Sequence, residues 1–331
     1  MRSAPLPRPV GHCRFPRLQS TASARGGFVS PITLSSAELE AAHRAGRLEW
    51  PADRLAAKAL EIRRDIITLL AKSQTGHTGG PLSCTDFATA LFFNELNIDP
   101  KNPKWADRDF WHFSIGHVTP VIYSQMAERG YFPLRDLMKF RAFDGHCQGH
   151  PSAHDTPGIE VSAGSLGQGL SICCGVAKGA KMDGHPRRVY CVMGDGEQQE
   201  GQIWESAMFA AHYKLDNLCG IIDYNRKQID GDVQDIMGIA PLDEKWRSFG
   251  WNVIPCKGHD MADVLAAFAK ARAHRGSPSL VLAHTVMGEG VSFMADDYKW
   301  HGKPPKMDQA ELALKELGTS YAEWSERLLA H

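Results

Sequence analysis

The segment Arg188-Val-Tyr-Cys-Val-Met-Gly-Asp-Gly-Glu-Gln-Gln-Glu-Gly201 joins a short apolar run to a carboxylate flanked by two glycines. The run at 188–193 is apolar without alternation, which is typical of a strand covered on both faces of a parallel sheet. Gly194 and Gly196 let the backbone approach a ligand closely. A helix that opens near Gly201 would point amide N–H groups and its positive dipole end toward the same place. The segment therefore predicts a strand whose carboxyl end borders a ligand site.

The alternation of strand and helix continues along the chain. Further strands are expected at 109–114, 218–223, 251–256 and 279–285, and helices at 117–129, 166–182, 201–213 and 260–274. A long helix is expected to begin near Asp53, which can serve as its N-cap. This order indicates an α/β fold with a doubly wound, mostly parallel sheet and helices on both faces. Ligands bind beyond the carboxyl ends of the strands in such a sheet.

The composition is that of an ordinary globular domain. The 331 residues are 43% hydrophobic and 23% charged, with a formal net charge of −1. This charge gives no reason to expect a nucleic acid or an anionic membrane as partner, and no apolar run approaches the roughly 18 to 20 residues that cross a bilayer. The eight cysteines contain no Cys-x-x-Cys pair, so free thiols in a reducing cytoplasm are expected.

Residues 1–35 differ from the single domain expected at 36–331. The first acidic residue is Glu38, and arginines and prolines are frequent before it. An Arg-rich leader without acidic residues is a feature of transit peptides, but the prolines would break the amphipathic helix of such a signal. The segment is predicted to be a disordered extension or the product of an over-long gene start.

Two polar residues follow neighbouring strands of the predicted sheet. Asp195 follows the strand at 188–193, and Asn225 follows the strand at 218–223, one crossover later. A carboxylate, an amide oxygen and a backbone carbonyl are hard donors that suit Mg²⁺, with phosphate oxygens completing its octahedron. An isolated Gly-Asp-Gly is more often a simple turn, but the Asn at crossover distance favours a metal site.

Gly-Asp-Gly followed by Asn at this distance resembles the motif of thiamine-diphosphate enzymes. The resemblance implies that Asp195, Asn225 and the main-chain carbonyl of Lys227 hold Mg²⁺, for which Ca²⁺ or Mn²⁺ can substitute. It also implies that Gly196 contacts the cofactor. The family more often has a hydrophobic residue where Lys227 stands, which matters little where only the carbonyl is used.

The histidines indicate which of these enzymes the chain resembles. His77, His117, His150 and His301 each adjoin a glycine and lie in four separate segments. A lone histidine is usually a surface or core residue whose hydrogen bonds are satisfied by its neighbours. Four glycine-flanked histidines around one predicted pocket indicate a functional site instead. With Gly164-Ser-Leu-Gly-Gln-Gly169 and Ile229-Asp-Gly231, they resemble the first half of transketolase over about residues 53–317. Pyruvate-dehydrogenase-type chains share the Gly-Asp-Gly element without this histidine set.

The resemblance implies a role for each histidine. His77 and His301 would face the reacting ketose and assist proton transfer. His150 would bind the substrate near its terminal hydroxyl. His117 would contact the cofactor diphosphate, together with His301. We therefore expect His77, His301 and His150 to be catalytic, and His117 and His301 to bind the cofactor.

The resemblance also assigns residues to the cofactor rings and to a subunit boundary. The backbone at Gly164 and the side chain of Leu166 would hold the pyrimidine and thiazolium rings, with Asp223 lining the same pocket. Glu200 and Glu205 resemble acidic residues that meet across the boundary between two subunits; an exposed helix face is the alternative.

The chain departs from the family at two positions. Thr78 follows His77 where the family commonly has proline, which alters the rigidity of the loop. Met287 stands where some relatives have a lysine, and this change would remove one diphosphate contact.

The resemblance further implies a partner chain. The family's activating glutamate and its aromatic clamp on the pyrimidine lie in the second half, and this sequence has no second α/β domain to supply them. We therefore expect a divided transketolase whose C-terminal subunit carries the pyrimidine-binding and C-terminal domains, assembled as α2β2. It would transfer a two-carbon ketol unit between sugar phosphates, as in the pentose phosphate pathway.

Three alternatives stay open at this point. The enzyme can act on a specialised ketose, such as apulose phosphate or a sulfosugar, or it can be a divided relative of 1-deoxyxylulose-5-phosphate synthase. A binding module that keeps the cofactor without catalysis is the non-enzyme alternative. Neighbouring genes would discriminate among the enzymes, and an intact histidine set argues against the module.

Overall fold

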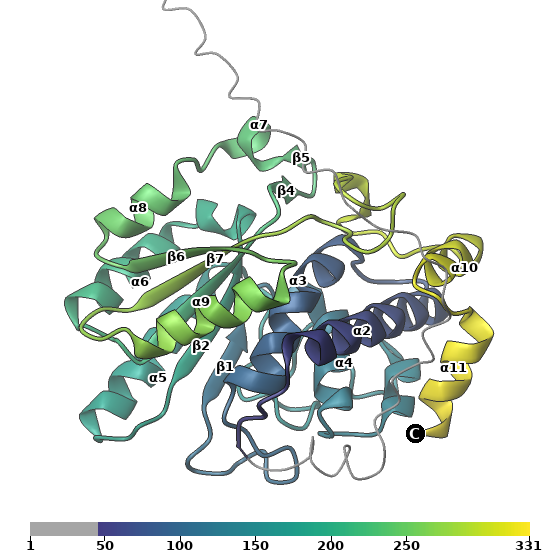
Figure 1. The fold of residues 1–331 in the computed structure, drawn as a ribbon, viewed down its shortest axis with the longest axis horizontal. Coiled ribbons are helices and arrows are strands. Elements are labelled where there is room, and N and C mark those ends of the chain that lie inside the picture. The colour runs from purple at the N-terminus through teal and green to yellow at the C-terminus, as the bar shows by residue number, and fades with distance from the viewer. Residues whose placement is uncertain (1–45) are drawn as a thin grey trace, which may run out of the picture. The chain divides into compact units, whose positions relative to one another are not determined.

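A parallel five-stranded sheet forms the centre of the computed structural model, which describes residues 46–331. The strands are β1 Phe110–Phe113, β2 Val189–Gly194, β3 Leu218–Tyr224, β6 Asn252–Lys257 and β7 Ser279–His284, in the order β1-β2-β3-β7-β6 (Figure 1). Every neighbouring pair is parallel. The five expected strands and the doubly wound fold are confirmed. The expected segment 1–35 lies outside the described residues.

Helices cover both faces of the sheet. One face carries α2 Ala52–Ser73, α3 Gly79–Ala90, α4 Thr119–Glu128 and α9 Met261–Ala273; the other carries α5 Gln168–Met182, α6 Gly201–His212 and α8 Leu242–Ser248 (Figure 1). Alternate residues of β2 serve the two cores: Tyr190 and Val192 pack on the first side, Val189, Cys191 and Met193 on the second. This division explains the unbroken apolar run in the sequence, because both faces of the strand are buried.

Helix α2 does not begin as the sequence indicates. Its N-cap position is Pro51, and Asp53 lies in the first turn, where its carboxylate interacts favourably with the helix dipole. The helix ends at Gln74, which adopts a left-handed conformation with φ of 51°. The prediction that Asp53 caps this helix is therefore wrong, although the helix itself is present.

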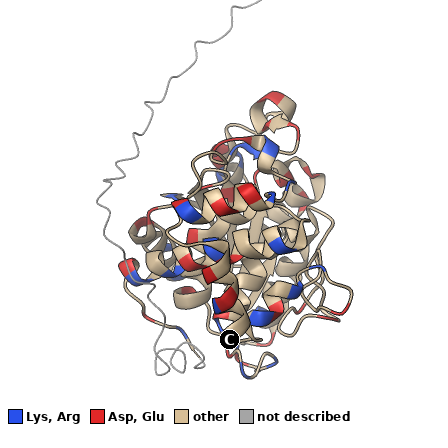
Figure 2. Ribbon diagram, turned by 90° about the vertical axis from the view of Figure 1, so that its right-hand side faces the viewer, with Lys and Arg blue, Asp and Glu red and all other residues tan. Residues whose placement is uncertain are grey.

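A buried network of charges joins α2 and α4 to the last helix, α11 Tyr321–Ala330. Lys58 pairs with Glu61 and, at 2.9 Å, with Glu128, while Arg327 of α11 donates to Glu128 at 2.7 Å. Burial alone would raise the pKa of Glu128, but Lys58 and Arg327 outweigh it and lower that pKa to about 2. Figure 2 faces this side and shows basic and acidic residues interspersed on the helices. The network fixes α11 against the domain, and α10 Met307–Glu316 packs on α2 beside it.

No helix within residues 46–331 combines the length and the apolarity needed to cross a bilayer. The seven cysteines in this part of the chain are buried free thiols.

Replacing Arg327 by Ala should lower the free energy of unfolding by about 3 to 5 kcal/mol, because the buried carboxylates lose their partner. The matched control is Arg247→Ala, which removes an exposed ion pair with Asp243 and should cost less than about 1 kcal/mol. Urea titration followed by circular dichroism measures both. Equal losses in the two variants would contradict the role given to the network.

Candidate active site

One cavity of about 380 Å³ lies at the carboxyl ends of the central strands. It is lined by every residue that the sequence predicts for the site: His77, His117, His150, Gly164, Leu166, Asp195, Gly196, Asp223, Asn225, Lys227 and His301. These residues come from several loops and strand ends that are far apart in the sequence. The fold therefore brings together the complete predicted set, in the place expected for a doubly wound sheet.

The register of the sheet sets Asp195 beside Asn225. Gly194 of β2 pairs with Asp223 of β3, so the segments that follow these two strands leave the sheet next to each other. The carboxylate of Asp195 accepts N–H bonds from Gly196 at 2.7 Å and from Arg226. Arg226 has a φ of 66°, and this left-handed turn brings its N–H back toward Asp195.

Asp223 orients Asn225 beneath the cavity. The side-chain amide of Asn225 donates to Asp223 at 2.8 Å, and its oxygen accepts the N–H of Lys227 at 2.9 Å. Ser83 and Thr285 also donate to Asp223. These bonds leave Asp223 satisfied by neutral donors. The amide oxygen of Asn225 therefore points toward Lys227, whose carbonyl is the third predicted ligand of the metal ion.

The donors fit a divalent cation. Asp195 is only 2% exposed, and burial, with the negative charge of Asp223 adding to it, raises the pKa of Asp195 to about 8. Within residues 46–331, no basic side chain forms an ion pair with Asp195 or Asp223. Two buried acids without a cation are costly, and a metal ion would balance them.

The predicted metal ligands are too few to complete a coordination sphere from protein atoms alone. Among the described residues there is no group of three or more His, Cys, Asp or Glu side chains placed to hold a metal ion. One carboxylate, one amide oxygen and one carbonyl leave half of an octahedron for other oxygens, which a diphosphate can supply. The residues therefore suit a metal that binds together with a phosphate ligand.

Three histidine rings cluster in the lining of the same cavity. The ring centroids are 5.0 Å apart for His77 and His117, 5.8 Å for His77 and His301, and 5.2 Å for His117 and His301. Burial, followed by the neighbouring histidines, lowers the pKa of His117 to about 3; burial, His301 and Arg141 lower that of His77 to about 4. All three rings are therefore neutral at pH 7, since burial also lowers the pKa of His301. His150 lies exposed at the rim.

Two of these rings have buried nitrogens without a protein partner. Nδ1 of His77 and Nδ1 of His301 are both buried and form no hydrogen bond within the described residues. An unsatisfied buried polar atom costs about 1 to 3 kcal/mol, so it is retained where a ligand uses it. The histidine side of the cavity is therefore built to bind polar groups.

Glu197 has a structural role that its sequence context does not predict. Its buried carboxylate accepts hydrogen bonds from Ser114, from the N–H of Gly167 at 2.7 Å and from the N–H of Gly194 at 3.0 Å. It thereby ties the ends of β1 and β2 to the 164–169 loop. The only signal in the sequence is its place two residues after Asp195.

Ser83 and Thr285 are two further residues that the pattern does not identify. Thr285 directly follows β7, and a polar residue at a strand end is a pattern that can indicate a site residue. Ser83 lies in the middle of α3, where no sequence pattern marks it. Glu200 lines the cavity, whereas Glu205 is exposed on α6 away from it. Their role across a subunit boundary stays a prediction.

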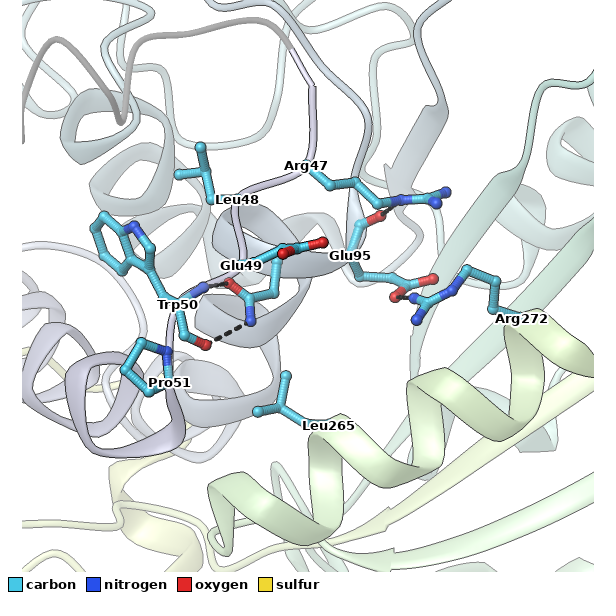
Figure 3. A pocket seen from close by; sticks show the side chains of 9 residues that line it. Arg47, Leu48, Glu49, Trp50, Pro51, Glu95, Leu265 and Arg272 are labelled. Atoms are coloured by element: carbon cyan, nitrogen blue, oxygen red, sulfur yellow. Dashed lines mark hydrogen bonds and ion pairs between the residues drawn. The ribbon is translucent and has the colours of Figure 1, made fainter.

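A second hollow of about 520 Å³ is lined by residues 47–51, by Asn94 and Glu95, and by Leu265 and Arg272 of α9 (Figure 3). Its two arginines are already bound to Glu95: Arg272 pairs with the carboxylate, and Arg47 donates to the backbone carbonyl at 2.6 Å. It contains none of the predicted residues, so the smaller cavity is the candidate active site.

A sequence model of the family described as transketolase, thiamine diphosphate binding domain, matches residues 56–325. The chain belongs to the transketolase family. An apulose-4-phosphate transketolase subunit of Actinobacillus succinogenes is 43% identical over 266 residues, which are 80% of this chain and 96% of that relative. The 6-deoxy-6-sulfo-D-fructose transketolase subunit of a Clostridium species is 39% identical over 77% of this chain and 93% of its own length.

Solved transketolases share the fold. The crystal structure of transketolase from Campylobacter jejuni superposes with a TM-score of 0.77 at 30% identity, over 83% of this chain and 45% of that one. The chain thus spans less than half of a solved transketolase but nearly all of the two subunits. The predicted family, its fold and its thiamine diphosphate-binding domain are confirmed, while the metal ion and the residue roles stay proposals.

Replacing Asp195 by Ala should abolish the Mg²⁺-dependent retention of thiamine diphosphate by the assembled enzyme. Asp223 and Glu197, the other buried carboxylates of the cavity, are already occupied by hydrogen bonds. The fold should survive, as seen by circular dichroism. The control is Asp308→Ala, which removes an exposed carboxylate on α10. Calorimetry measures cofactor binding, and undiminished binding in the Asp195 variant would remove that residue from the metal site.

Proposed function

We propose that this chain is the N-terminal subunit of a two-chain transketolase, which transfers a two-carbon ketol unit from a ketose phosphate to an aldose phosphate. The observation that carries the proposal is coverage: the chain matches 96% and 93% of two transketolase subunits but 45% of a one-chain enzyme. A complete predicted site on this chain supports a catalytic rather than a purely structural role.

The metal, the cofactor and the histidines would share this one cavity. Asp195, Asn225 and the carbonyl of Lys227 would hold Mg²⁺ against the diphosphate, with Gly196 beside it. His117 and His301 would donate to the diphosphate as neutral imidazoles, and Gly164, Leu166 and Asp223 would border the rings. When bound, thiamine diphosphate supplies an electron sink for the two-carbon unit.

His77 and His301 would handle protons of the sugar. Each has a buried Nδ1 without a protein partner in the described part of the chain, and each is neutral at pH 7 because its pKa is lowered. A neutral imidazole can accept a hydroxyl proton at one nitrogen while donating from the other. His150, at the exposed rim, would bind the far end of the sugar.

The surroundings of the cavity support a partner subunit. Ile229 lines the cavity yet is 61% exposed, and Ile236 and Met237 on the adjoining α7 Val233–Met237 are 45% and 61% exposed. Apolar side chains around an open site are typical of a surface that another chain covers. A C-terminal subunit with the pyrimidine-binding domain would complete the site, in an α2β2 assembly.

A specialised ketose is the second candidate for the substrate. The two subunit relatives at 43% and 39% identity are named for apulose 4-phosphate and 6-deoxy-6-sulfo-D-fructose. Both relatives are transketolase subunits, so the reaction class is common to the two candidates and only the sugar differs. Assays with these ketoses and with xylulose 5-phosphate separate the candidates.

The chain on its own should show no transketolase activity, because half of the cofactor would face water. Mixing it with the C-terminal subunit should restore glycolaldehyde transfer to an aldose phosphate, and the two should co-elute at a mass of two copies each. The measurement is a coupled assay on each chain alone and on the mixture, repeated with each ketose. Full turnover by this chain alone would falsify the two-chain enzyme.

Replacing His77 or His301 by Ala should lower kcat by about 10² to 10⁴ at saturating thiamine diphosphate, the range for loss of a general acid or base. His154→Ala is the matched control, because its side chain is 95% exposed and does not line the cavity. Steady-state kinetics of the assembled enzyme measure the effect. If extra cofactor restores the full rate, these histidines serve binding alone.

A further inference from the structure

His259, outside the cavity, lies at the meeting point of three segments that are distant in the sequence. Its Nδ1 is 2.7 Å from the carboxylate of Asp86 of α3. That carboxylate also accepts two hydrogen bonds from the guanidinium of Arg63 of α2, at 3.0 and 2.6 Å. Burial alone would raise the pKa of Asp86, but Arg63 and His259 outweigh it and lower that pKa to about 2. The carboxylate is therefore ionised and acts only as an acceptor.

The second ring nitrogen of His259 faces the main chain. Its Nε2 accepts the N–H of Val286 at 2.8 Å. A nitrogen that accepts an N–H carries no proton, so the proton of the neutral ring must lie on Nδ1, where Asp86 accepts it. Both contacts require the same tautomer.

Val286 opens the loop that carries two cavity residues, Met287 and His301. Successive peptides of this loop are held: Val286 by His259, the N–H of Gly288 by the carbonyl of Gly79 at 3.0 Å, and the carbonyl of Glu289 by Arg63 at 3.1 Å. Met287 lies so close to Gly79 that a Cβ there would be 2.5 Å from its Cγ. A small shift of the loop therefore moves the wall of the cavity next to His77.

We propose that His259 is a positioning residue: Asp86, itself held by Arg63, keeps it in the Nδ1–H tautomer, so that its Nε2 fixes Val286 and thereby the place of Met287 and His301. Asp86, Arg63 and, at 4.0 Å, Glu289 are the charged groups that face the ring. Its effect on turnover rests on the function proposed above; the anchoring of the loop does not.

Two amide variants separate the two contacts of the ring. In His259→Asn the amide takes the place of Nδ1, so it keeps the bond to Asp86 and loses Val286. In His259→Gln the amide oxygen reaches the place of Nε2 and can still accept from Val286. The amide of Val286 should exchange with solvent about 10-fold faster or more in the Asn variant than in the Gln variant. His274→Gln, at a histidine whose ring contacts Ser277, is the control.

Amide exchange is measured by NMR on the isolated chain, relative to Ile221 of β3, whose exchange reports opening of the core. The ¹⁵N shifts of His259 should show the proton on Nδ1 in the unmodified chain. Kinetics of the assembled enzyme should show a kcat about 10-fold lower for Asn than for Gln. A proton on Nε2, equal protection of Val286 in both variants, or equal kcat would each overturn the proposal. An inactive unmodified assembly would instead contradict the proposed function, since exchange is read without an assay.

Discussion

Parallel pairing of β2 with β3 sets Gly194 opposite Asp223, and the chain leaves these strands side by side as Asp195 and Asn225. The rest of the site depends on this register, because a shift of one residue would turn Asp195 into the packed face of the sheet. The register is specified by burial on both faces: alternate residues of β2 fill two different cores. Packing of ordinary apolar side chains thus determines the position of Asp195, the proposed metal ligand.

The same end of the sheet contains buried carboxylates that lack a cationic partner and histidine nitrogens that lack a hydrogen-bond partner within residues 46–331. Asp195 and Asp223 are buried acids without a basic partner in the described chain, while three neutral histidines in the same cavity keep two ring nitrogens unpaired. Both costs would disappear on binding of the proposed cation, with its phosphate ligand, and of a polyhydroxy substrate. The apolar side chains around the mouth of the cavity, such as Ile229, are exposed in this chain, and the proposed second subunit would remove them from water.

Much of this site is predictable from the sequence, since strand ends and glycine-flanked polar residues leave local patterns. The strands, the doubly wound fold, Asp195, Asn225 and the four histidines follow from such patterns, whereas Gly164, Leu166 and the carbonyl of Lys227 come from the resemblance to transketolase. Glu197, Ser83 and the pair of Asp86 with His259 do not, because each acts through partners far away in the chain. The incorrect N-cap at Asp53 shows the other limit: a helix start depends on backbone geometry that one residue type does not fix.

The ends of β2 and β3 are proposed to hold a metal ion together with a thiamine diphosphate. Anomalous diffraction tests it most directly, from crystals of the assembled enzyme grown with Mn²⁺ and the cofactor. One Mn²⁺ peak is expected per copy of this chain, within coordination distance of the Asp195 carboxylate, the Asn225 side-chain oxygen and the Lys227 carbonyl. A peak elsewhere, or cofactor density whose diphosphate lies away from these three atoms, would contradict it.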